Sequence, residues 1–305
     1  MPEIKSISGV LKTFKDDLSI LHQLFIEKYK AQQCKNDCGL ITETYKHVKK
    51  RRCYQCSKCR NQVYPTKGTI FEGSTTSLAD WMCLIFDVCD DGKSANRFKR
   101  RYNVTYKTAW RISYKIRELI SKNDMLDQFT GTVEIDESFF GGKRYLSQMN
   151  SKPTKTSRKK RKAGTGKGIA DTQPVFGMKE RDGRAKLIVI NNFQTIKRKV
   201  VMPYIKMYVK EGATIHTDGA GIYKCLSKLG YEHKVVIRKK GVPIKKGIDN
   251  NGIEGLWGNI KTKIKATHRN IGRKYYQLYL DEFCFRYKRG FTECFNLLWS
   301  WICHP

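Results

Sequence analysis

The sequence predicts an α/β fold, in which a mixed β-sheet is flanked by helices and preceded by a cysteine-rich module and a helical domain. Three observations support this prediction. Apolar residues alternate with polar ones around Val133 and Ile135, which is typical of a strand. From residue 132 onward the pattern is a strand, a hairpin, and then alternating helices and strands, as in a mixed sheet covered by helices. Five cysteines fall between Cys34 and Cys59, as in a metal site.

The composition indicates a polyanionic partner. The chain has 305 residues, 60 Lys and Arg against 28 Asp and Glu, and a formal charge of +32. Nucleic acid is the first candidate, because contacts of Lys and Arg with phosphates supply most non-specific affinity; a membrane surface is the alternative. No apolar segment approaches the ~18 residues of a transmembrane helix, and the N-terminus lacks the apolar region of a signal peptide. We therefore expect a protein that neither spans a membrane nor is secreted.

Residues 1–33 are expected to form an N-terminal helical segment. Apolar residues recur near helical spacing between residues 5 and 30, which predicts one amphipathic helix. These apolar residues are Leu11, Phe14, Leu18, Leu21 and Phe25.

Residues 34–75 are polar and rich in cysteine, and they suggest small strands and turns. Two closely spaced pairs of cysteines stand out: Cys34, Cys38, Cys56 and Cys59. Their four thiolates can converge tetrahedrally on one structural zinc ion, which predicts a zinc ribbon. Cys53 is a spare that competes with Cys56 as a ligand. The other six cysteines lie in apolar surroundings, and we expect them to be buried. They are Cys83, Cys89, Cys225, Cys284, Cys294 and Cys303.

Residues 76–125 predict three helices that form a helix-turn-helix-like DNA-binding domain. The first is apolar from residue 78 onward, the second runs near Ser94–Arg101, and the third begins after the N-cap residue Thr105. In this layout the last helix can enter a major groove. Its basic residues expected to contact DNA are Lys107, Arg111 and Lys115. The alternative is a solvated basic face on an ordinary helical hairpin.

Residues 130–270 are expected to form the sheet-and-helix core, and residues 271–305 a group of C-terminal helices. Strands are predicted from Thr132 and at Pro174–Glu180, Lys186–Asn191, Ala213–Thr217 and His233–Ile237. Helices are predicted at Thr195–Lys210, near Gly221–Leu229 and at Asn251–Lys265. A basic loop is predicted within the core at residues 151–170. Its central run is either a phosphate-contacting segment or a nuclear-import signal. The run consists of Arg158, Lys159, Lys160, Arg161 and Lys162.

Acidic residues occupy the ends of predicted core elements. Asp136 lies on the first strand, and alternation points it and Glu134 to one face, opposite Val133 and Ile135. Asp218 follows an apolar strand, at the carboxyl end where open α/β sheets place their ligands. An acid in such a place is unfavourable unless it is paired or binds a cation.

A third acid, Glu254, lies on the predicted helix Asn251–Lys265 and shares one helical face with Asn251 and Lys261. Lys261 suits a phosphate oxygen. Together with Asp136 and Asp218, Glu254 can hold two divalent ions, which activate a water or a 3′-hydroxyl and stabilise the leaving oxygen. Oxygen ligands favour Mg²⁺ or Mn²⁺. The alternative for each acid alone is a surface or salt-bridged carboxylate.

Several ordered motifs surround these acids. They are Val133-Glu-Ile-Asp-Glu-Ser-Phe-Phe-Gly-Gly-Lys143, Thr217-Asp-Gly219 with Tyr223, Asn251-x-x-Glu254-x-x-Trp257-x-x-x-Lys261, and Tyr279-Leu-Asp-Glu-Phe283 with Arg286-Tyr287. The front end adds Cys56-x2-Cys59, Gly68-Thr-Ile-Phe71 and Thr108-Ala-Trp110. By these motifs, residues 34–290 resemble the Merlin superfamily of DDE transposases and its bacterial insertion-sequence relatives. The spacing of 36 positions (254 − 218) from Asp218 to Glu254 is also similar to that of Merlin elements.

The resemblance implies a ribonuclease-H-like catalytic core in which Asp136, Asp218 and Glu254 bind two Mg²⁺ or Mn²⁺ ions. It implies that the substrate is double-stranded DNA, whose terminal inverted repeats are cleaved by water and then joined to target DNA. Asn251 is a competing or accessory catalytic residue, and Lys261 matches the family's trailing basic residue. The chain departs from the family pattern in its wider first cysteine pair and in Lys288, where Asn is expected.

Joining requires two DNA ends, so we expect a homodimer or a larger assembly. It would act in the nucleus of a eukaryotic host or in the cytoplasm of a bacterial one. Two alternatives stay open. One is a domesticated, non-catalytic, sequence-specific DNA-binding protein with an idle core, and the other is a nuclease of the same fold, such as a junction resolvase.

Overall fold

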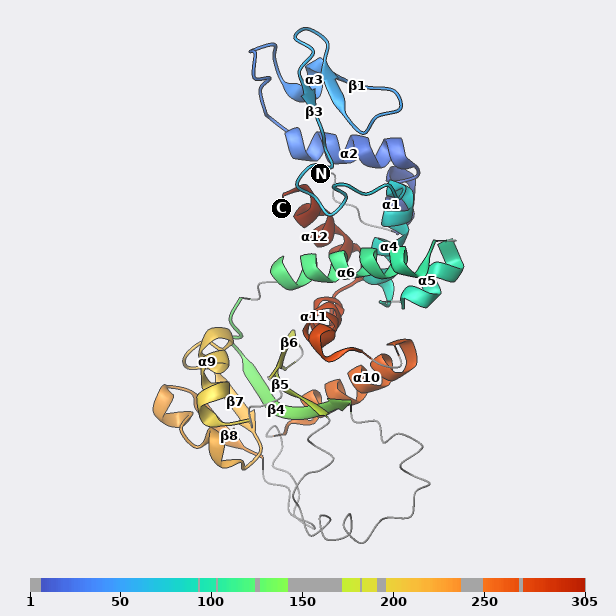
Figure 1. Cartoon of the computed structure of the whole chain (residues 1–305). Helices are drawn as coiled ribbons and strands as arrows, with labels where there is room; N and C mark the ends of the chain where they lie inside the picture. Colours follow the sequence, from blue (N-terminus) through green and yellow to red (C-terminus); the bar gives the residue numbers. More distant parts are fainter. Residues whose placement is uncertain are drawn as a thin grey trace. The chain divides into compact units, whose positions relative to one another are not determined.

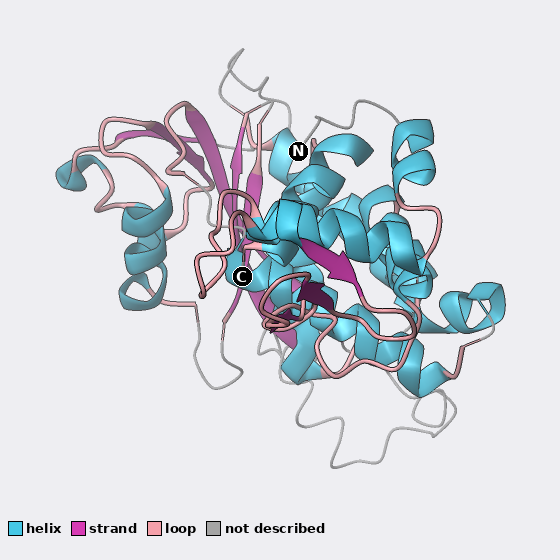
Figure 2. Cartoon of the chain, turned by 90° about the horizontal axis from the view of Figure 1, so that it is seen from above, coloured by secondary structure: helices cyan, strands magenta, loops and turns pink. Residues whose placement is uncertain are grey.

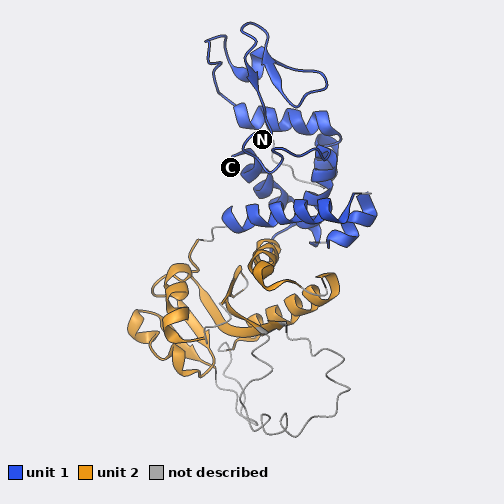
Figure 3. Ribbon diagram, in the orientation of Figure 1, with its two compact units in different colours: residues 1–124, 288–305 blue, residues 125–287 orange. Residues whose placement is uncertain are grey.

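The structure, a computed structural model, consists of two compact units (Figures 1 and 3). The first comprises Met1–Asp124 and Lys288–Pro305, and the second comprises Met125–Tyr287. The residues that the structure describes are 7–92, 94–102, 104–123, 127–141, 172–181, 183–190, 196–236, 249–268 and 271–304. The predicted basic loop, with Arg158, Lys159, Lys160, Arg161 and Lys162, lies outside them.

The N-terminal segment contains two helices where the apolar spacing predicts one. Helix α1 spans Ile7–Thr13 and helix α2 spans Asp17–Tyr29. Asp16 starts α2, because its side chain accepts a hydrogen bond from the Ser19 amide at 2.7 Å while the Ser19 hydroxyl bonds the Asp16 backbone. The capping box therefore starts a second helix within a segment whose apolar spacing is typical of one continuous helix. Of the apolar residues that predict one helix, Leu11 and Leu18 are exposed, whereas Phe14, Leu21 and Phe25 are buried.

A small three-stranded antiparallel sheet packs on α2. Its strands are β1 (Tyr45–His47), β2 (Tyr54–Cys56) and β3 (Gln62–Val63), in that order, preceded by the short helix α3 (Ile41–Thr44). The ring of Tyr54 stacks on that of Phe25 in α2, with centroids 3.8 Å apart. The prediction of small strands and turns in this region is confirmed.

The rest of unit 1 is helical, and three of its helices follow the predicted positions. They are α4 (Leu78–Asp90), α5 (Ala95–Tyr102) and α6 (Tyr106–Asn123). A further helix, α12 (Phe291–Cys303), contacts α2, α4 and α6 and places Trp299 against Phe14. The expected group of C-terminal helices is therefore divided. Helix α11 (Tyr276–Arg286) belongs to unit 2 and α12 to unit 1, because the apolar side of α12 supplies core to the N-terminal helices.

Unit 2 contains a mixed five-stranded sheet, as predicted. The strands are β4 (Thr132–Gly141), β5 (Thr172–Glu180), β6 (Ala185–Val189), β7 (Thr214–Thr217) and β8 (Glu232–Val235). Their order is β6-β5-β4-β7-β8, with β6, β5 and β4 antiparallel and β4, β7 and β8 parallel. Figure 2 draws all strands in magenta and helices in cyan. A mixed sheet flanked by helices is consistent with the ribonuclease-H-like fold.

Helices cover the two faces of this sheet with separate cores. One core packs α9 (Arg198–Tyr208) on Val133, Ile135 and Ile215. The other packs α10 (Asn251–His268) and α11 on Val175 and Leu187. In place of the helix predicted near Gly221–Leu229, the structure has two 3-10 helices, Gly221–Tyr223 and Ser227–Leu229. The second ends at Gly230, which adopts the left-handed conformation (φ 85°). A further 3-10 turn, Arg273–Tyr275, precedes α11.

The acidic motif of α11 attaches that helix to the outer strand β6. Asp281, which is 3% exposed, accepts hydrogen bonds from Lys186 on β6 at 3.1 Å and from Gln277 at 3.0 Å. Gln277 also accepts from the Val189 amide and donates to the Leu187 carbonyl, so it satisfies backbone groups on the free side of this strand. The motif that resembles the transposase family therefore stabilises the sheet edge.

Replacing Asp281 with Asn is expected to lower the free energy of unfolding of unit 2 by about 3 kcal/mol, because the Lys186 ammonium stays buried without its counter-ion. Urea titration followed by circular dichroism measures this loss. Glu232→Gln, which removes an exposed carboxylate from the same unit, should leave the transition almost unchanged. Equal midpoints for the two variants would contradict the assignment.

Candidate metal centre, DNA-binding helix and acidic site

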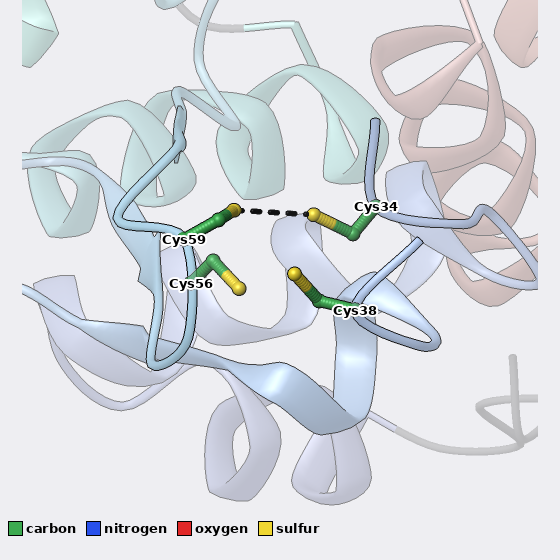
Figure 4. A group of neighbouring side chains, drawn as sticks. All are labelled: Cys34, Cys38, Cys56 and Cys59. Carbon is green, nitrogen blue, oxygen red and sulfur yellow. Dashed lines mark hydrogen bonds between the residues drawn. The ribbon is translucent and has the colours of Figure 1, made fainter. Parts of the chain in front are cut away.

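Four cysteines of unit 1 converge as the ligands of a tetrahedral metal would (Figure 4). The sulfur atoms of Cys34, Cys38, Cys56 and Cys59 all lie within 4.8 Å of one another. The first two belong to the loop before α3, and the last two to the end of β2 and the turn that follows it. The group contains Cys56 and not Cys53, which favours Cys56 of the two cysteines that the spacing leaves as competing ligands. Cys53 is fully buried nearby, and burial raises the pKa of its thiol.

The surroundings of this cluster lower the pKa of Cys34 and Cys56, which favours their thiolate forms, whereas burial raises the pKa of Cys38. The Tyr45 hydroxyl bonds the Cys34 sulfur at 3.3 Å and lowers the pKa of that thiol to about 6. Cys34 and Cys59 sulfurs stand 3.5 Å apart. Four cysteines close the coordination sphere and leave no open position for a substrate, so the donor set fits a structural metal such as zinc. Among the described residues, this group alone brings three or more potential ligand atoms so close together.

The other six cysteines differ in burial. Cys89, Cys284, Cys294 and Cys303 are buried, as predicted, whereas Cys83 and Cys225 are half-buried.

Helix α6 presents basic side chains on its N-terminal half. Thr105 caps the helix by accepting from the Thr108 amide at 3.1 Å, as predicted. Lys107 and Arg111 are exposed, whereas Lys115 is half-buried and donates to the Ile70 carbonyl at 3.2 Å. Of the three residues expected to contact DNA, the structure therefore leaves two facing solvent and directs the third to a backbone oxygen.

Helix α5 adds a second basic surface beside α6. Arg97, Lys99 and Arg100 are exposed, and Phe98 between them is buried. Arg101 pairs with the buried carboxylate of Asp87 at 3.2 Å. A helix with its apolar residue inside and its basic residues outside suits contact with phosphates.

Strand register directs Asp136 and Asp218 toward the same part of the sheet. Strand β4 pairs with β7 in parallel, with Thr132 opposite Thr214 and Glu134 opposite His216 as the last pair. Asp218 follows the end of β7, and continuing the offset of 82 residues (214 − 132) would bring it level with Asp136 on the neighbouring strand. Asp218 is exposed at the end of β7, where its carboxylate accepts from the Ala220 amide at 3.0 Å.

Asp136 points to the face of the sheet that α10 covers, as alternation predicts. Its carboxylate accepts a hydrogen bond from the Trp257 indole at 3.1 Å. Burial raises the pKa of Asp136, and the charges of Asp218 and Glu254 add to the increase. Asp218 and Glu254 therefore both lie near enough to Asp136 to affect its charge, although among the described residues the three carboxylates do not converge as closely as the four cysteines do.

The Trp257 contact depends on a glycine in the neighbouring strand. Gly177 on β5 lies opposite Asp136 in the sheet register. A β-carbon at Gly177 would stand 2.5 Å from the Trp257 ring, so any side chain there would displace the indole. Trp257 thus lies over the strand at Gly177 and reaches Asp136 from α10.

Helix α10 begins at Asn251, as predicted, and continues three residues beyond the predicted end. Glu254 and Asn251 are exposed in its first turn, and Lys261 is exposed two turns on, with its ammonium 5.4 Å from the Phe140 ring centre. The predicted apolar stripe beside them is buried against the sheet. It comprises Ile253, Leu256, Trp257 and Ile260, with Ile264 half-buried.

Two further residues near the acids, Glu137 and Tyr223, stand in the sequence motifs but have no role assigned from the sequence. Glu137 points to the sheet face opposite Asp136 and accepts a hydrogen bond from the Tyr223 hydroxyl. Burial raises the pKa of Glu137 to about 7, and the charges of Asp136 and Asp218 add to it. The sequence shows Tyr223 five residues after Asp218, but only the fold shows that its hydroxyl bonds Glu137 on β4.

Comparison with known protein families gives a match that covers almost all of unit 2. A family model described as an ISXO2-like transposase domain matches residues 128–288, or 161 (288 − 128 + 1) of the 305 residues. The matched segment contains Asp136, Asp218 and Glu254. No curated protein matches the chain. None of the helices in the described parts of the chain has the length and apolar character that a membrane crossing requires.

Proposed function

Because the chain belongs to the ISXO2-like transposase domain family, we propose that it is a DNA transposase that cleaves terminal inverted repeats and joins them to target DNA. Its motifs resemble those of the Merlin superfamily of DDE transposases. The single observation that supports catalysis is the Asp136 carboxylate, which is half-buried in the middle of strand β4 and whose pKa the charges of Asp218 and Glu254 help to raise.

The proposed chemistry assigns a role to each residue of this site. Asp136, Asp218 and Glu254 would hold a pair of Mg²⁺ or Mn²⁺ ions, which activate the attacking hydroxyl and stabilise the leaving oxygen when bound. Trp257 orients Asp136 through its indole N–H. Lys261, two turns after Glu254 on the same helix, is placed to bind a phosphate oxygen. Asn251, in the first turn, is an accessory group for the same phosphate or its metal.

Unit 1 would supply DNA recognition. The exposed Lys107 and Arg111 on the N-terminal half of α6 suit the major groove, and the basic side chains of α5 suit the flanking phosphates. One zinc ion on the four cysteines would hold the ribbon in its folded form. Because two DNA ends must meet for joining, the working form is a homodimer or a larger assembly.

The decisive experiment incubates the zinc-loaded protein with Mg²⁺ and a duplex that ends in the terminal repeat of its own genomic copy. We expect 3′-end cleavage followed by joining to a plasmid, both abolished by EDTA. Cleavage of branched DNA without joining would instead identify a nuclease of the same fold. Tight, salt-sensitive DNA binding without any turnover would identify a non-catalytic DNA-binding protein.

Recognition by α6 is tested separately from catalysis. Lys107→Ala and Arg111→Ala are each expected to weaken binding to the terminal repeat. If the lost contact is to a phosphate, the slope of log K against log salt concentration should fall by about 1. Fluorescence anisotropy at several salt concentrations measures both quantities. Lys122→Ala is the matched control, because Lys122 lies on the last turn of the same helix and pairs with Glu118. Equal affinities for all three variants would exclude α6 from the interface.

A further inference from the structure

The first turn of α10 is attached to strand β4 by a buried carboxylate that the proposed chemistry does not use. Glu134, only 2% exposed, accepts a hydrogen bond from the backbone amide of Ile253 at 2.7 Å. An amide in the first turn of a helix has no partner within that helix, so Glu134 acts as a cap supplied by a distant strand. The positive end of the helix dipole adds to the attraction.

An arginine connects the same carboxylate to the segment that enters the helix. Arg181 donates to Glu134 at 3.3 Å and to the Asp249 carbonyl at 3.1 Å, and it pairs with the Asp249 carboxylate at 3.3 Å. His216 on β7 bonds the same carbonyl at 3.0 Å. Asp249, two residues before α10, is therefore held by β7 and by the turn after β5, while the first helical turn is held by β4.

The fit leaves no space for a side chain at the contact. A β-carbon at Gly252 would stand 2.7 Å from the Glu134 carboxylate and 2.8 Å from the Lys179 ammonium. Glu134 and Lys179 are directly opposite in the β4–β5 register, and both are buried. The glycine before Ile253 thus lets the helix backbone approach the two strands closely.

These contacts bear on the acidic site because of where they lie. Ile253 immediately precedes Glu254, and Glu134 lies two residues before Asp136 on the same strand, about 6.6 Å away along it. We propose that Glu134 is a positioning residue, which fixes the first turn of α10 so that Glu254 stands beside Asp136. One strand then presents the first acid of the site and holds the helix that presents the last. This assignment rests on the proposed function, since it concerns the same acids.

The test measures Mn²⁺ binding to the full, zinc-loaded chain by isothermal titration calorimetry, without DNA. We expect Glu134→Gln to raise the Kd for Mn²⁺ about tenfold to a hundredfold, the usual effect of removing a partner that orients a metal ligand. Gly252→Ala, which keeps Glu134 but displaces the helix backbone, should do the same. Hydrogen exchange of the Ile253 amide should accelerate in both variants, while exchange in α9 stays unchanged.

Asp281→Asn is the matched control, because it also removes the charge of a buried, ion-paired carboxylate from unit 2 but touches α11 rather than α10. It should lower stability and leave the Kd for Mn²⁺ as in the wild type. Should Glu134→Gln fail to fold, Gly252→Ala decides the question. Wild-type Mn²⁺ affinity in the folded variants would overturn the positioning role alone. A wild-type chain that binds no Mn²⁺, or binds it equally after Asp218→Asn, would overturn the proposed function and this assignment with it.

Discussion

Asp218→Asn is expected to reduce Mg²⁺-dependent cleavage of terminal-repeat DNA by at least about a thousandfold. Metal ions contribute several kcal/mol of transition-state stabilisation, and each 1.36 kcal/mol is a factor of ten in rate. The substitution keeps the size of the side chain but removes the negative charge that Asp136 senses across the strand pair. The rate of 3′-end release in single-turnover gel assays measures the loss.

The controls for this prediction separate chemistry from binding and folding. Glu232→Gln alters an exposed carboxylate of the same unit and should leave cleavage intact. Affinity of Asp218→Asn for the DNA end, measured without divalent metal, should equal that of the wild type. Residual cleavage within a few-fold of wild type in the Asn variant would rule out Asp218 as a metal ligand.

Removal of the metal from the cysteine cluster is expected to unfold the ribbon. Its strands have only two or three residues each, too few to stabilise an isolated sheet, so ligation must supply the folding energy. Apparent binding energies of structural zinc in small modules are about 10–16 kcal/mol. Cys56→Ser should therefore abolish zinc binding and expose the amides of β1 and β2 to hydrogen exchange, whereas those of the unit 2 sheet stay protected.

Cys53→Ser is the matched control, because Cys53 precedes Cys56 by three residues but lies outside the cluster. It should retain one zinc ion per chain, as measured by atomic emission. If Cys53→Ser loses the ion and Cys56→Ser keeps it, the ligand assignment is reversed. If neither loses it, a different set of ligands binds the metal.

Local sequence patterns predict a structural feature correctly where the interactions that determine it lie near each other in the sequence. Alternation along β4 predicts the face of Asp136, and its hydrogen bond with Trp257 agrees. The cap at Thr105 predicts the start of α6, and the apolar stripe of α10 predicts which side of that helix is buried. The prediction of one helix was wrong at Asp16, where a capping box starts α2 and interrupts the apolar spacing. The prediction of a helix after Asp218 was also wrong, because two 3-10 turns replace it.

Distant partners account for what local patterns did not show. The choice of Cys56 over Cys53 depends on how two loops meet, which cysteine spacing does not specify. The involvement of Glu137 with Tyr223 crosses 86 residues, and that of Glu134 with Ile253 crosses 119. Helix α12 is separated from α11 by a short turn, yet it joins the N-terminal unit because Phe14 and Trp299 bury each other's rings.

Residue order alone thus determined most of the elements, the mixed sheet, the zinc-ligand candidates and the acidic residues, since periodicity, caps and donor chemistry are properties of short segments. Only the folded chain decided which acid faces which helix and which cysteine joins the cluster. It also decided that Glu134 holds the start of α10. Such choices follow from contacts between segments that lie 25 residues apart at the cysteines and 121 residues apart at Asp136 and Trp257, and no short stretch of sequence contains that information.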